Sequence, residues 1–178
     1  MGCIRPLGFT HDYGIGMNLY FKFVKTLNVA AMGAEGMDEL RRDVRVREFE
    51  RETQLRTSIK FSPEFVVPLL SAHDGDADPS YSKETRDKGY EEYPYLISLA
   101  AADRDLQTAI AHEHFAGRDF DTVRAISAQI LRALSHLPTS GVIHGDLKPS
   151  NLVRHKNVFK LIDLGAATRL KDFAGKHK

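Results

Sequence analysis

The chain has 178 residues, which is enough for one or two small domains. Its formal net charge of +1 and its hydrophobic fraction of 42% are ordinary for a folded protein, and neither indicates a nucleic-acid partner. The single cysteine, Cys3, excludes an internal disulfide, and no apolar run is long enough to cross a membrane. We therefore expect an intracellular, cytoplasmic protein with no transmembrane segment and no nucleic-acid partner.

The first half of the chain combines predicted strands with one long helix. Apolar residues alternate with polar ones in the segment 17–29, which predicts a strand. The segment 38–59 is rich in charged helix formers and carries a single sparse apolar stripe, which predicts a partly exposed helix. Two further strands are predicted over 64–72 and 95–102, and Pro68 indicates that the first of them is an edge strand or contains a bulge.

The second half begins with two predicted helices, a short one over 105–115 and a long one over 119–137. Apolar residues recur every three or four positions in the long helix, and Asp119 is a suitable N-cap. Two short strands, 152–155 and 158–163, surround a Lys-Asn turn. This order of elements predicts an α+β fold with a sheet-rich first half and a helical second half.

The stretch "HGDLKPSN", from His144 to Asn151, places a carboxylate, a lysine and an amide within a few positions. A hydroxyl that attacks a phosphoryl group needs a carboxylate near its proton, and the phosphates need Mg²⁺ with oxygen ligands. Asp146 can supply the carboxylate, Lys148 can contact a phosphate, and Asn151 can offer an amide oxygen. The stretch "LIDLG" adds a second carboxylate, Asp163, before a glycine that permits a sharp turn.

The two motifs resemble the catalytic loop H-R-D-L-K-P-x-N and the D-F-G motif of the eukaryotic protein kinase family, and they occur in the same order. The resemblance covers about residues 18–170. It implies a protein-kinase-like fold. An antiparallel-sheet N-lobe with one helix, together with the hinge, would occupy residues 1–101, and the start of a helical C-lobe would occupy 102–178. It also implies ATP with Mg²⁺ and a protein partner as substrate, and the lysine at 148 is typical of the Ser/Thr branch.

The same resemblance gives roles to the polar residues of both motifs. Asp146 would orient the acceptor hydroxyl and take its proton, and Lys148 would neutralise charge on the γ-phosphate. Asn151 and Asp163 would hold Mg²⁺.

Upstream of the loop, the resemblance implies a lysine for the α- and β-phosphates and a glutamate that pairs with it. Lys22 fits the place of the lysine best, with Lys25 as the alternative. Glu52 fits the place of the glutamate, with Glu48 as the alternative, because the helix contains several glutamates.

The adenosine part of the nucleotide would be held by residues around the strand 95–102. The resemblance puts Ser98 or Leu99 at the gatekeeper place, and a hinge from Leu99 to Ala101 would bind adenine through its backbone. Asp105 would lie near the ribose, and Leu152 would lie under the adenine ring.

The sequence departs from the family in three ways. Gly145 replaces the arginine of H-R-D, which in the family reads a phosphate on the activation loop, so we expect such control to be missing. No glycine-rich phosphate loop with the family's spacing precedes Lys22, and the chain stops about a dozen residues after "DLG". We therefore expect roughly the first half of a kinase domain, with weak or no activity alone.

Two other functions are compatible with these motifs. Small-molecule kinases of the aminoglycoside or choline type also have H-G-D in this loop, as this chain has at Gly145, although "LKP" and "DLG" are less usual there. A pseudokinase or nucleotide-binding scaffold would fit the absent glycine-rich loop, whereas the retained Asp146, Asn151 and Asp163 favour an enzyme.

Overall fold

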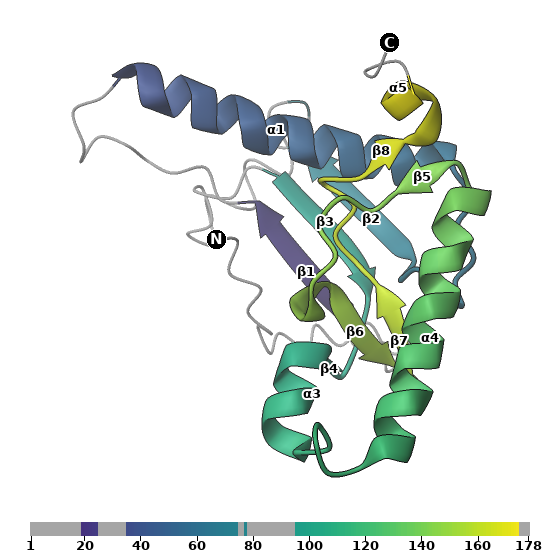
Figure 1. Cartoon of the computed structure of the whole chain (residues 1–178). Coiled ribbons are helices and arrows are strands. Elements are labelled where there is room, and N and C mark those ends of the chain that lie inside the picture. Colours follow the sequence, from purple (N-terminus) through teal and green to yellow (C-terminus); the bar gives the residue numbers. More distant parts are fainter. Residues whose placement is uncertain (1–18, 25–34, 75–76, 78–94, 175–178) are drawn as a thin grey trace, which may run out of the picture.

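The structure is a computed structural model that describes residues 19–24, 35–74, 77 and 95–174 (Figure 1). Within this part of the chain, three small antiparallel sheets are combined with helices. The predicted α+β fold class is confirmed. Among the described residues, no helix is long and apolar enough to span a membrane.

The first sheet contains the three longest strands, β1 (Leu19–Val24), β2 (Leu69–Asp74) and β3 (Tyr95–Ala100). Their order is β1-β3-β2, and both neighbouring pairs are antiparallel. The register places Lys22 of β1 directly opposite Ile97 of β3. The strand predicted over 95–102 is thus present from its first residue to Ala100, and the strand predicted over 17–29 is present in its described residues, 19–24.

Pro68 lies just before β2, which is an edge strand whose register with β3 shifts near its start. The carbonyl of Pro68 accepts a hydrogen bond from the backbone N–H of Ala100 (3.1 Å). Of the two predicted alternatives, the edge position is confirmed in the described sheet, and the register shifts between Leu69 and Ser71. The strand begins later than predicted because the residues before Pro68 pair elsewhere: Val67 donates to the carbonyl of Leu161 (3.0 Å), and Leu161 donates to that of Phe65 (2.8 Å).

The long helix α1 (Glu35–Ser58) lies across one end of the first sheet (Figure 1). It corresponds to the helix predicted over 38–59. The ring of Phe49 packs against that of Tyr95, with 5.0 Å between the ring centroids. Phe49 belongs to one buried apolar cluster, which we call the sheet cluster, and its buried members are Phe49, Val67, Tyr95, Ile97, Leu99, Val153 and Ile162.

The described second half contains the two predicted helices, short strands and a further five-residue helix, α5, that was not predicted. Their bounds are β4 (Arg104–Asp105), α3 (Leu106–Glu113), α4 (Phe120–Thr139), β5 (Val142–Ile143), the 3-10 turn η1 (Pro149–Asn151), β6 (Leu152–His155), β7 (Val158–Leu161), β8 (Thr168–Arg169) and α5 (Leu170–Ala174). Strands β4, β6 and β7 form a second sheet, and β5 pairs with β8.

Local chemistry explains the helix ends. Asp119 caps α4, because its carboxylate accepts the backbone N–H of Thr122 (3.0 Å), as predicted. The helix continues two residues past its predicted end at 137 and includes Pro138. Pro138 has no N–H to continue the helical hydrogen bonds, and the helix ends one residue later at Thr139. The two-residue strands β4, β5 and β8 were not predicted, since such short segments have no periodicity.

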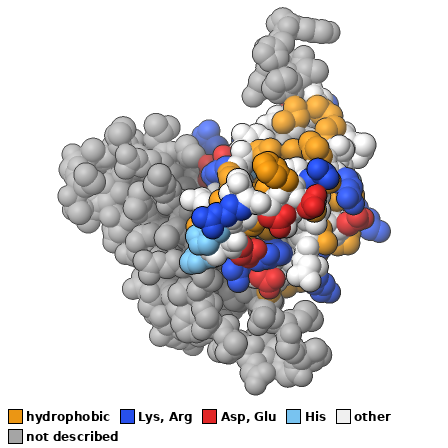
Figure 2. Space-filling view, turned by 60° about the horizontal axis from the view of Figure 1, so that its bottom comes forward, with side chains coloured by type: hydrophobic (Ala, Val, Ile, Leu, Met, Phe, Trp, Pro, Cys, Tyr) orange, Lys and Arg blue, Asp and Glu red, His pale blue; other side chains and the backbone are white. Residues whose placement is uncertain are grey.

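A second buried cluster, which we call the helix cluster, lies between α4, β7 and α1. Leu55 of α1, Leu137 of α4 and Leu161 of β7 belong to it. Its buried members are Leu55, Val66, Leu106, Ala109, Phe115, Ala133, Leu137, Val142, Leu152, Phe159, Leu161, Leu164 and Ala167. Helix α1 therefore contributes to both clusters, with Phe49 in the sheet cluster and Leu55 in the helix cluster. On the face shown in Figure 2, basic and acidic side chains are intermixed rather than grouped by sign.

Candidate active site

The β6–β7 hairpin brings the two predicted magnesium ligands to the same end of the second sheet. Asn151 immediately precedes β6, and Asp163 follows β7 by two residues. Since the strands are antiparallel, the start of β6 lies beside the end of β7. The backbone N–H of Ile162 donates to the carbonyl of Asn151 (3.0 Å), which extends the pairing toward both residues.

The side chain of Asn151 is buried, and its amide nitrogen and amide oxygen have different surroundings. Its amide nitrogen Nδ2 donates to the backbone carbonyl of Asp146 (2.8 Å) and to the carboxylate Oδ2 of Asp146 (3.1 Å). Its amide oxygen Oδ1 is buried and has no hydrogen-bond partner among the described residues. A buried acceptor without a partner is costly, and a hard cation is one ligand that would satisfy it. The donor set therefore fits Mg²⁺.

Asp163 adopts an unusual backbone conformation, with φ at +58°. Non-glycine residues in this left-handed region are uncommon and often occur at functional sites. The backbone N–H of Gly165 donates to Oδ1 of Asp163 (3.3 Å), which steadies the carboxylate. No group of three or more His, Cys, Asp or Glu side chains gathers as a metal cage in the described part of the chain. Mg²⁺ in a nucleotide site needs only one or two such ligands besides phosphate, so the pair is sufficient.

Asp146 presents a carboxylate at the surface of the loop, with 41% of its side chain exposed. Lys148 Nζ donates to its Oδ2 at 2.5 Å. The hydrogen bond from Lys148, aided by that from Asn151, holds the pKa of Asp146 below its ordinary value. The group therefore stays ionised to lower pH than a free aspartate, and as an acceptor it can orient a hydroxyl.

His144 connects the predicted catalytic loop to the end of β7. Its ring is buried, and Nε2 donates to the carbonyl of Ile162 (3.0 Å). The other nitrogen, Nδ1, faces the backbone N–H of Asp146 at 3.4 Å. Because a carbonyl can only accept, the ring carries its proton on Nε2. Asp146 and Asp163 are thus positioned through the same imidazole.

A steric constraint, which the sequence did not reveal, explains why position 145 is a glycine. Its φ is +79°, and a Cβ atom there would lie 2.4 Å from the carbonyl oxygen of Ala166. The predicted catalytic loop and the segment after Asp163 approach too closely for any side chain at this position. Glycine in place of the arginine of H-R-D therefore also permits this close packing.

On α1, Glu52 is completely buried, whereas Glu48 is exposed. This difference favours Glu52 as the residue that pairs with a buried cation. Lys22 is placed by its backbone pairing opposite Ile97, whose side chain lies in the sheet cluster with Phe49 of α1. The alternative Lys25 lies outside the described residues.

The predicted adenosine-binding residues lie around the end of β3. Leu99 and Leu152 are both buried, the former in the sheet cluster and the latter in the helix cluster. The carbonyl of Ala101, in the predicted hinge, accepts a hydrogen bond from Nδ1 of His155 at 2.5 Å. Asp105 caps α3, because its Oδ1 accepts a backbone N–H of the first turn at 2.6 Å.

Two arginines of α1 that sequence reasoning missed attach this helix to the site. Arg51 Nη1 donates to the carbonyl of Gly165 (3.3 Å), and Arg56 Nη1 donates to the carbonyl of Val67 (2.7 Å), which is itself hydrogen-bonded to Leu161 of β7. The helix contains many arginines, so its sequence gives no signal that distinguishes these two.

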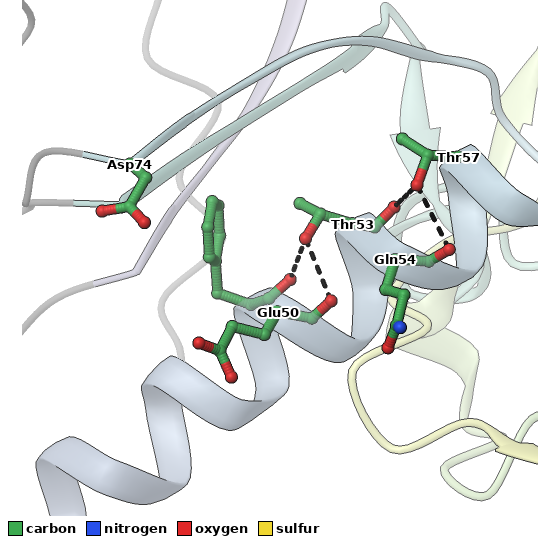
Figure 3. A pocket seen from close by; sticks show the side chains of 6 residues that line it. Glu50, Thr53, Gln54, Thr57 and Asp74 are labelled. Atoms are coloured by element: carbon green, nitrogen blue, oxygen red, sulfur yellow. Dashed lines mark hydrogen bonds between the residues drawn. The ribbon is translucent and has the colours of Figure 1, made fainter. Parts of the chain in front are cut away.

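A hollow of about 560 Å³ lies on another face of α1, toward Asp74 of β2 (Figure 3). The hydroxyls of Thr53 and Thr57 donate to helix carbonyls, as the dashed lines in Figure 3 show. No residue of the catalytic loop or of the "DLG" segment lines it. We therefore do not connect this hollow with the chemistry.

Comparison with known proteins is consistent with this geometry. Residues 38–176 match the model of the protein kinase domain, so the chain belongs to the protein kinase family. It is similar to GLH-binding kinase 1 of Caenorhabditis elegans, with 35% identity over 122 residues, which is 67% of this chain and 27% of that protein. It is also similar to the chloroplastic serine/threonine-protein kinase STN7 of Arabidopsis thaliana, with 30% identity over 121 residues, 66% of this chain and 19% of that one.

A third relative is the serine/threonine-protein kinase MPS1 of Saccharomyces cerevisiae, with 32% identity over 78 residues, 44% of this chain and 10% of that protein. The chain thus spans no more than 27% of the length of these three relatives. The resemblance inferred from "HGDLKPSN" and "DLG" is confirmed at the level of the family.

The close approach at Gly145 makes a testable prediction. We expect Gly145→Ala to lower the free energy of unfolding by about 2–4 kcal/mol, because backbone strain adds to the collision with Ala166. Gly117→Ala is a matched control, since Gly117 also has a positive φ (+76°) but no atom within 4 Å of the added Cβ. The free energy of unfolding of this control should fall only by the cost of backbone strain, about 1 kcal/mol. Urea unfolding of both variants measures the difference, and equal losses would contradict the steric explanation.

Proposed function

We propose that this chain carries the nucleotide site and the catalytic loop of an ATP-dependent protein kinase that phosphorylates Ser or Thr hydroxyls. The observation that supports it most directly is the side chain of Asn151, which holds Asp146 with one end and presents a buried, unpartnered oxygen at the other. One residue thus couples a carboxylate for the acceptor to a ligand for the metal. The boundary between the two lobes would lie between residues 101 and 102.

In this proposal Asp146 acts on the acceptor. Its carboxylate is accessible and ionised, so it can accept a hydrogen bond from a Ser or Thr hydroxyl and take the proton as the hydroxyl attacks. Lys148 lies within hydrogen-bond distance of Asp146 and would move to the transferred phosphate, where its charge offsets that of the phosphate oxygens.

The remaining residues would hold the nucleotide. Lys22 would contact the α- and β-phosphates, with Glu52 as its partner. The backbone between Leu99 and Ala101 would bind adenine, with Leu152 below the ring.

Asn151 and Asp163 would hold Mg²⁺, and Asp105 would face the ribose in addition to capping α3. When bound, Mg²⁺ neutralises charge on the phosphates. Most of the rate gain would come from positioning and charge neutralisation by the chain's own groups.

The family match and the names of the three relatives favour a protein kinase over a small-molecule kinase. A nucleotide-binding scaffold differs from an enzyme only in transfer, so two measurements on the same chain separate them.

We expect Asp146→Asn to reduce phosphate transfer by at least about a hundredfold, because a general base contributes roughly 10²–10⁴ in rate. Its affinity for Mg·ATP should change little, because Asp146 acts on the acceptor. Radiolabel transfer to a generic basic protein and calorimetry measure the two quantities. Transfer is measured on a protein extended through a complete kinase domain, because we expect weak or no activity from the first half alone. Full transfer by its Asp146→Asn variant would contradict the mechanism, and an extended wild-type protein that binds nucleotide without any transfer would favour the scaffold.

Asp163→Asn tests the metal ligand. Loss of a unit negative charge facing the cation should weaken Mg·ATP binding about tenfold or more, while binding of adenosine should be unchanged. Calorimetry with and without Mg²⁺ checks this. If both proteins show the same affinity for Mg·ATP, Asp163 is not a metal ligand.

A further inference from the structure

Glu52 and Arg56 form an ion pair in the interior, one turn apart on α1. Arg56 Nε donates to Glu52 Oε1 at 2.9 Å, and their side chains are 0% and 3% exposed, respectively. The desolvation cost of two buried charges often equals or exceeds their attraction, so such a pair adds little stability compared with apolar residues. Apolar residues of similar volume in place of both partners would fill the same space at lower cost, whereas removing Arg56 alone would leave the charge of Glu52 buried without a partner cation in this pair. Stability alone is therefore a weak reason for this arginine.

The guanidinium makes a second contact, which connects it through Val67 to the strand that leads to Asp163. Arg56 Nη1 donates to the carbonyl of Val67 at 2.7 Å. Val67 in turn donates to the carbonyl of Leu161, at the end of β7 and two residues before Asp163. Arg56 therefore connects the carboxylate of Glu52 to the strand that carries the "DLG" segment.

The third nitrogen of the same group, Nη2, is buried and has no hydrogen-bond partner in the described part of the chain. An unsatisfied buried donor on a charged group is costly. The orientation of the guanidinium is thus set by its contacts with Glu52 and Val67 rather than by complete satisfaction of its donors.

We propose that Arg56 is a positioning residue, which fixes the buried carboxylate of Glu52 so that Glu52 can hold the phosphate-binding lysine, Lys22. A carboxylate can accept hydrogen bonds from two cations at once, so one glutamate can serve both. The register of β1 places Lys22 opposite Ile97, in whose cluster Phe49 of α1 also lies. This role rests on the proposed function, because it needs Lys22 to bind phosphates.

The test compares two ligands that differ only in phosphates. We expect Arg56→Met to weaken Mg·ATP binding about tenfold, the loss of roughly one charge-assisted hydrogen bond, and to leave adenosine binding within about twofold. Arg56→Lys retains the charge and should recover most of the Mg·ATP affinity. Calorimetry on the 178-residue chain measures both ligands.

Arg124→Met is the matched control, because Arg124 also pairs with an acidic residue of its own helix, Asp121, at an exposed site. It should change neither affinity. A second comparison uses Glu52→Gln: if Arg56 acts through Glu52, adding Arg56→Met to Glu52→Gln should weaken Mg·ATP binding by no more than about twofold further.

The outcomes separate a positioning role for Arg56 from a purely structural one. Equal losses for Mg·ATP and adenosine in Arg56→Met, with no recovery in Arg56→Lys, would show that Arg56 only supports the fold and would overturn the proposal. Tighter Mg·ATP binding in Arg56→Met would also overturn it, since Arg56 would then compete with Lys22 for Glu52. A wild-type chain that does not distinguish Mg·ATP from adenosine would refute the proposed function itself, and this role with it.

Discussion

The side-chain amide of Asn151 is the interaction on which the candidate site depends. Its nitrogen donates twice to Asp146, and this leaves its oxygen buried and directed away from that residue. An amide cannot rotate to satisfy the oxygen without giving up both donors, so the orientation is fixed. The same hydrogen bonds that hold this loop in shape thus also orient the oxygen that we propose as a ligand for a cation.

The arrangement around Asn151 requires three separate parts of the chain to meet. The β6–β7 hairpin sets Asn151 beside Asp163, and His144 ties the loop to the end of β7. Helix α1 reaches the same region through Arg51 and Arg56, and it packs into both buried clusters. A shift of α1 would therefore affect the glutamate and the strand leading to Asp163 together.

Much of the fold and of the candidate site could be predicted from the sequence, because each motif is a short, continuous segment of the chain. The polar residues of the candidate site lie in two short motifs, from Asp146 to Asn151 and from Asp163 to Gly165. The β6–β7 hairpin, helix α4 and the N-cap at Asp119 could be predicted from local sequence patterns.

Contacts between distant segments could not be predicted. The collision that a Cβ at Gly145 would make with Ala166 depends on how two segments cross. The choice of Arg56 among many arginines of α1 depends on which face the packing buries, and a sparse apolar stripe does not fix that face.

The central claim is that Asn151 presents its amide oxygen to the metal of a bound nucleotide, and paramagnetic relaxation tests it most directly. In a ¹⁵N-labelled chain, Mn²⁺ added with ATP should broaden the side-chain amide signals of Asn151, because relaxation falls steeply with distance. The amide of Gln129, whose oxygen accepts the backbone N–H of Phe159 in β7, serves as the reference. Selective broadening of Asn151 is the predicted result. Equal broadening of both amides, or none of Asn151 when Mn·ATP is bound, would contradict the account.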